Sequence, residues 1–144
     1  MITKNFLLFI ALTCFSFFSF SQNDANFDFE KDIVDKGWSV EDTTQKAEHE
    51  MMILLIEKDS LYLGYINWIE GMASSVCAYN YEALENCVEL TATNCSEGSS
   101  LRYLYLYLSE DKLTLHLLFE DEKLTDTSAI RKKKGWIRFE QFTE

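Results

Sequence analysis

The chain contains no proline and only 5 glycines among its 144 residues. Proline-rich linkers, polyproline segments and collagen-like repeats are therefore excluded, and no repeat or low-complexity segment marks a domain boundary. Histidine is also scarce, with 2 residues, whereas a hydrolytic metal site uses two or three imidazoles. Lysine and arginine number 13 against 24 acidic residues, so the formal net charge is -11 at pH 7. This charge opposes nucleic acid and anionic lipid, and we expect no nucleic-acid partner.

The amino-terminal segment has the order of a secretory signal peptide. Lys4 supplies one positive charge, residues 6–20 are almost wholly apolar, and Ser19-Phe20-Ser21 places small residues where a signal peptidase cleaves. The apolar run is shorter than the roughly 20 residues that a membrane-spanning helix needs. We therefore expect residues 1–21 to be cleaved, and the protein to be secreted or periplasmic with no membrane span. An uncleaved anchor and lipidation at Cys14 are the alternatives.

Residues 22–144 suit one domain with a single core, beginning with a polar lead-in over residues 22–36. Cleavage removes Lys4 and no acidic residue, which takes the formal charge from -11 to -12. Such a chain repels its own copies and stays in solution.

Three cysteines, Cys77, Cys87 and Cys95, remain after cleavage, in a protein bound for an oxidising compartment. One disulfide is expected, and one thiol is then left over. The sequence does not fix the pairing, although we favour Cys77 with Cys87 or Cys95. The spare thiol is either buried, a link between two copies, or a redox site. The spacing does not resemble a zinc site, so we expect no metal.

Two-residue periodicity predicts two hairpins. Met51–Ile56 and Leu61–Ile69 are apolar, β-branched and aromatic, with turn residues between them. Leu101–Leu108 alternates leucine with tyrosine, and Leu113–Glu120 alternates apolar with more polar residues, which is typical of half-buried strands.

The other segments give weaker signals. Residues 37–40 and 135–139 fit a first and a closing strand, residues 30–34 fit a short helix, and Leu124 fits a further short strand. Residues 74–88 fit either a helical stripe or strands. The whole pattern predicts a mainly β fold, an antiparallel meander of six to eight strands closed as a small barrel or folded as a sandwich, with room for one short helix.

Gly37-Trp38 at the start of the first strand, the run of hairpins and Arg138 on the last strand resemble lipocalin-like small barrels. The resemblance covers about residues 36–139, and it departs from the family pattern because the glycine and the tryptophan are adjacent instead of one residue apart. It implies a barrel whose interior holds a small apolar ligand. No residue identifies that ligand.

Three tyrosines, Tyr103, Tyr105 and Tyr107, share one face of one strand and form the leading candidate for ligand or partner contact. Trp68, at the end of the first hairpin, is added to this candidate set. The alternative is that the tyrosines stack on neighbouring strands and close a second core.

Enzymatic constellations are absent from the sequence. His49 and His116 fit solvated or hydrogen-bonded side chains, the acidic pairs fall in predicted turns, and no nucleophile, phosphate or dinucleotide motif is found. The basic block at residues 131–134 fits a solvated loop, with an anionic surface as the alternative partner.

The preferred hypothesis is an exported, non-catalytic binding protein with no cofactor. It either carries a small apolar ligand in a lipocalin-like barrel or contacts a partner through the aromatic face. The alternative is an exported enzyme or enzyme inhibitor of unknown chemistry, assembled around the two histidines.

Overall fold

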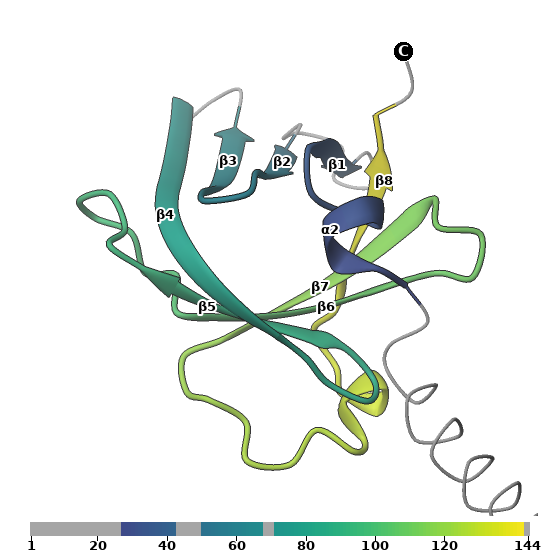
Figure 1. Cartoon of the computed structure of the whole chain (residues 1–144). Coiled ribbons are helices and arrows are strands. Elements are labelled where there is room, and N and C mark those ends of the chain that lie inside the picture. Colours follow the sequence, from purple (N-terminus) through teal and green to yellow (C-terminus); the bar gives the residue numbers. More distant parts are fainter. Residues whose placement is uncertain (1–26, 43–49, 68–70, 143–144) are drawn as a thin grey trace, which may run out of the picture.

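The computed structural model describes residues 27–42, 50–67 and 71–142, and their eight strands form one closed antiparallel barrel (Figure 1). Each strand pairs with the next in sequence, and β8 returns to pair with β1. The predicted meander is confirmed, and it closes as a barrel. The predicted signal peptide lies outside the described residues. The strands are β1 (Lys36–Asp42), β2 (Glu50–Ile56), β3 (Leu61–Asn67), β4 (Gly71–Ala83), β5 (Val88–Thr93), β6 (Tyr103–Leu108), β7 (Thr114–Glu120) and β8 (Ile137–Gln141).

Both predicted hairpins are present. In the first, Ile56 of β2 faces Leu61 of β3, and the N–H of Glu57 donates to the carbonyl of Ser60 across the turn at 2.8 Å. In the second, Leu108 of β6 faces Leu115 of β7. The alternating leucines of these strands point into the barrel, because opposed residues on antiparallel strands lie on the same face.

The segment that fitted both a helix and strands, residues 74–88, is not helical: as far as Ala83 it belongs to one long curved strand, β4, and a turn then leads to Val88 at the start of β5 (Figure 1). Its first half pairs with β3, where Leu61 faces Cys77, and its second half pairs with β5, where Ala78 faces Thr93. Each half of the strand forms a hydrogen-bonded ladder with one neighbour, and this pairing outweighs the weak helical stripe.

One short helix, α2 (Phe29–Asp32), precedes β1, close to the predicted residues 30–34. The carboxylate of Asp28 caps it by accepting the N–H of Lys31 at 3.3 Å. No helix in the described part of the chain is long and apolar enough to cross a membrane.

A second, smaller core lies outside the barrel. The connection between β7 and β8, which includes the 3-10 turn η1 (Ile130–Lys132), folds back so that Ile130 packs with Cys87, Tyr105 and Leu118. The prediction of a short strand near Leu124 was wrong, because Leu124 belongs to this connection and packs against the same cluster. Leu124 is the single leucine in a polar, charged stretch, so no apolar neighbours extend a strand from it.

Candidate functional site

Helix α2 covers one end of the barrel. Ile33, which directly follows the helix, is fully buried in the interior core. The carboxylate of Asp32 lies 3.0 Å from the ammonium of Lys112 in the β6–β7 turn, and Glu30 accepts a hydrogen bond from the hydroxyl of Tyr81 on β4 at 3.0 Å. Because these contacts reach strands on different sides of the barrel, the helix closes that end.

Toward the opposite end, the inward-facing side chains are apolar and only half-buried. Val40 of β1 faces Met52 of β2, and both pack against the interior core. Two residues deeper along the same strands, Trp38 and Leu54 are fully buried. Along β1 and β2, burial therefore decreases with distance from α2. The half-buried apolar residues that pack against the core away from α2 are Val40, Met52, Leu63, Ala92, Leu101, Phe119 and Ile137.

Trp38 carries a buried indole N–H that has no acceptor among the described residues. The second described tryptophan, Trp136, instead donates its indole N–H to the carbonyl of Ile130 at 3.1 Å. An unpaired buried donor has a free-energy cost of about 1–3 kcal/mol. Arg138, part of the resemblance to lipocalins, points outward, and its side chain is 67% exposed.

The tyrosine face divides between two environments. Tyr105 is fully buried in the second core, where burial and the nearby carboxylate of Glu89 raise its pKa to about 12. Tyr103 and Tyr107 are half-buried. Tyr105 therefore fits the alternative interpretation, in which the tyrosines close a second core, and its side chain has no exposed surface. Trp68 lies outside the described residues, and the contact role of the set remains a prediction.

Tyr107 lies in an outward-facing group that we call the aromatic–basic cluster, made of Tyr107, His116, Arg131, Trp136 and Arg138. The rings of Tyr107 and His116 stack with centroids 4.4 Å apart and planes 8° apart, and Trp136 meets Tyr107 edge-on at 4.9 Å. The guanidinium carbon of Arg131 lies 4.5 Å from the centre of the Tyr107 ring. The cluster joins the tyrosine face to the basic block, which were separate features of the sequence.

Of the two histidines, only His116 lies among the described residues. Burial, reinforced by Arg138 and Arg131, lowers the pKa of His116, which favours its neutral form. His49 lies outside the described residues. No group of three or more potential metal ligands occurs among the residues that the structure describes.

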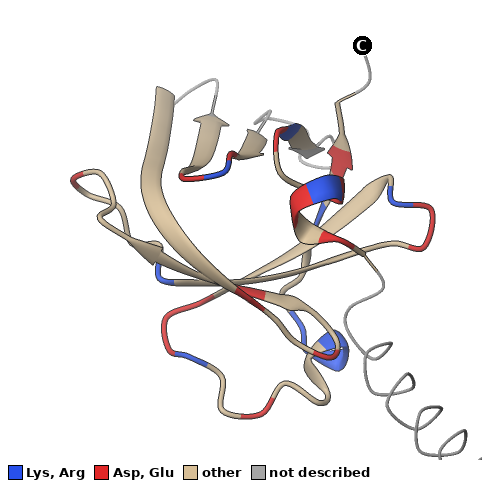
Figure 2. Ribbon diagram, viewed as in Figure 1, with Lys and Arg blue, Asp and Glu red and all other residues tan. Residues whose placement is uncertain are grey.

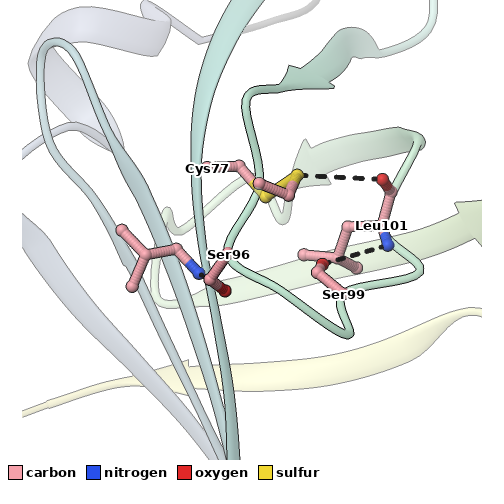
Figure 3. The surroundings of a disulfide bond; sticks show 6 residues. Cys77, Ser96, Ser99 and Leu101 are labelled. Carbon is pink, nitrogen blue, oxygen red and sulfur yellow. Dashed lines mark hydrogen bonds between the residues drawn. A yellow bond between two sulfur atoms is a disulfide. The ribbon is translucent and has the colours of Figure 1, made fainter.

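Cys77 and Cys95 form a disulfide (Figure 3), and Cys87 is free. This is one of the two favoured pairings, and it ties β4 to the loop after β5. The N–H of Val76 donates to the hydroxyl of Ser96 beside it at 3.1 Å. Cys87 is the buried thiol expected for the spare cysteine. Burial and the charge of Glu89 raise its pKa to about 11, so its reactive thiolate is scarce at neutral pH.

Two surface features were missed by the sequence analysis. A hollow of about 280 Å³ lies between α2 and β4. Tyr79 and Tyr81, two residues apart on one face of β4, line it, and this spacing is the only sequence feature that could have indicated it. The strands β2, β3 and β4 carry few charged residues (Figure 2), and apolar side chains lie on their outer face. Met51, Ile66 and Met72 face one another across it, and Met72 is 75% exposed. The lack of any charged residue in residues 61–81 except Glu70 was its sequence signal.

No family model matches the chain, and neither a curated protein nor a solved structure matches it.

Proposed function

We propose that the chain is an exported, non-catalytic binding protein that carries a small apolar ligand in the half-buried end of its barrel. The observation that carries the proposal is the gradient of burial inside the barrel: Trp38 and Leu54 are fully buried near α2, whereas Val40 and Met52 retain exposed apolar surface. Ligand pockets are concave and mostly apolar, and the mouths of β-barrels are among their usual places.

One further observation supports the proposal. The Cys77–Cys95 disulfide suits a protein that works in an oxidising compartment, in keeping with the predicted signal peptide.

The test compares two tryptophan substitutions on neighbouring residues of β5. Ala92 faces the barrel interior, whereas Thr93 faces outward, and both are half-buried. Ala92→Trp fills the half-buried end, so we expect it to weaken binding of a fluorescent fatty acid at least about tenfold, which corresponds to about 1.4 kcal/mol. Thr93→Trp is the matched control and leaves binding unchanged.

A second pair of substitutions keeps the test valid if Ala92→Trp fails to fold. Met52→Gln places an amide in the same apolar end, and Met51→Gln makes the same change on the outer face. Circular dichroism and urea unfolding verify that each variant folds. Failure of the wild-type protein to bind any fatty acid or hydrophobic dye, or equal binding by all four variants, rejects the proposal.

A further inference from the structure

The aromatic–basic cluster lies on the outer face of β6, β7 and β8. Tyr107 of β6 is directly opposite His116 of β7, and His116 is directly opposite Arg138 of β8. Arg131, from η1, extends over the Tyr107 ring. Two guanidinium groups from separate segments therefore flank one stacked ring pair, and both are close enough to lower the pKa of His116.

The Arg131 side chain is held in place without being neutralised. Its Nε–H donates to the backbone carbonyl of Asn86 at 2.9 Å, and its guanidinium packs on the Tyr107 ring. Within the described residues no carboxylate forms an ion pair with Arg131. A fixed guanidinium with its terminal N–H groups available loses less conformational entropy when it binds an acceptor.

Arg138 is only weakly neutralised. An oxygen of Glu140 lies 3.9 Å away with both side chains mostly exposed, and the exposed Asp111 is close enough for Arg138 to help lower the pKa of its carboxyl. Ion pairs of this kind contribute little, because water screens them. Arg138 therefore keeps its capacity to bind another anion.

Two lysines of the same connection are neutralised by close carboxylates. Lys133 pairs with Glu120 at 2.5 Å, and Lys123 pairs with the buried carboxylate of Glu89 at 3.4 Å. Arg131 and Arg138 have no carboxylate this close, so they add positive charge to the surface of a chain whose formal net charge is -11. The blue segment at η1 marks part of this surface (Figure 2).

We propose that the aromatic–basic cluster binds a small oxyanion, the sulfate, phosphate or carboxylate group of a ligand, between Arg131 and Arg138 and beside His116. Guanidinium groups bind oxyanions through paired, charge-assisted hydrogen bonds, and the neighbouring rings displace water from them. The negative charge of the whole molecule favours a small anion over a polyanion, which feels the repulsion of many acidic side chains. This site is on the outer surface and does not depend on the interior ligand.

The experiment follows the imidazole of His116 by NMR, titrating pH in sodium sulfate and in sodium chloride at equal ionic strength. A bound dianion favours the imidazolium, so sulfate raises the pKa of His116 by about one unit at saturation. The charged groups facing His116 are Arg131 and Arg138, with Glu140 reached through Arg138. His49, the second histidine of the chain, is the internal control for general salt effects.

Variants locate the effect. Arg131→Gln with Arg138→Gln removes both guanidiniums and abolishes the difference between the two salts, while Arg102→Gln, which removes an arginine from another loop, leaves it intact. The same titration in phosphate and in acetate identifies which oxyanion binds best. Equal pKa values of His116 in sulfate and chloride overturn the proposal, and so does a sulfate effect that persists in the double variant.

Discussion

The hydroxyl of Tyr105 accepts a hydrogen bond from the backbone N–H of Leu124 at 2.9 Å, and so joins β6 to the connection between β7 and β8. The Tyr105 ring is fully buried beneath that connection. One residue of the tyrosine face is thereby part of the structure that positions η1, and with it Arg131 of the aromatic–basic cluster.

Tyr105→Phe removes this acceptor and leaves the partly buried N–H of Leu124 without its partner. We expect the free energy of unfolding to fall by about 1–3 kcal/mol. Tyr103→Phe is the matched control, because Tyr103 is on the same face but only half-buried, and we expect a change within about 0.5 kcal/mol. Urea unfolding of both variants measures the difference. Equal losses in the two variants would contradict the role given to the Tyr105 hydroxyl.

The Cys77–Cys95 disulfide closes a segment with a sequence separation of 18 residues. Reduction restores conformational freedom to the unfolded chain, so we expect a loss of about 3 kcal/mol in the free energy of unfolding. The measurement is urea unfolding with and without a thiol reductant. In the control variant Cys77→Ala with Cys95→Ala, the reductant has no effect. A wild-type protein equally stable with and without the reductant would disprove the link.

Asp32 couples α2 to the barrel in a pH-dependent way. Burial alone would raise the pKa of Asp32, but the N–H of Asp28 and the ammonium of Lys112 together hold it below the ordinary 3.8. A depressed pKa in the folded state means that the stabilisation is present above about pH 4 and is lost as the pH falls further. We therefore expect Asp32→Asn to destabilise the protein at pH 7 and to matter less at pH 3. Urea unfolding at both pH values tests this, and a difference independent of pH contradicts it.

Much of the fold could be predicted because the two-residue period is strong where one strand face is buried. Leu104 and Leu106 point inward, with Tyr105 between them pointing outward, as the alternation indicated. Residues 74–88 could not be assigned, because a strand that pairs with β3 and then with β5 depends on distant neighbours rather than on local preference. Closure into a barrel depends in the same way on the pairing of β1 with β8.

The candidate sites were less predictable. Periodicity tells which face of a strand a residue occupies, but it does not tell what covers that face. Tyr105 and Tyr107 have the same phase on β6, yet the connection containing η1 buries one ring and leaves the other half-exposed. Arg131 and His116 are 15 positions apart in sequence, and only the folded connection brings both onto Tyr107.

The most direct test of the proposed function uses methionine methyl groups. Met52 faces the half-buried end of the barrel interior, whereas its neighbour Met51 and the exposed Met72 lie on the outer face. In NMR spectra of protein labelled with ¹³C at the methionine methyls, titration with a fatty acid should shift the Met52 signal and leave those of Met51 and Met72 in place. Shifts confined to Met51 and Met72, or no shift at all, would contradict binding inside the barrel.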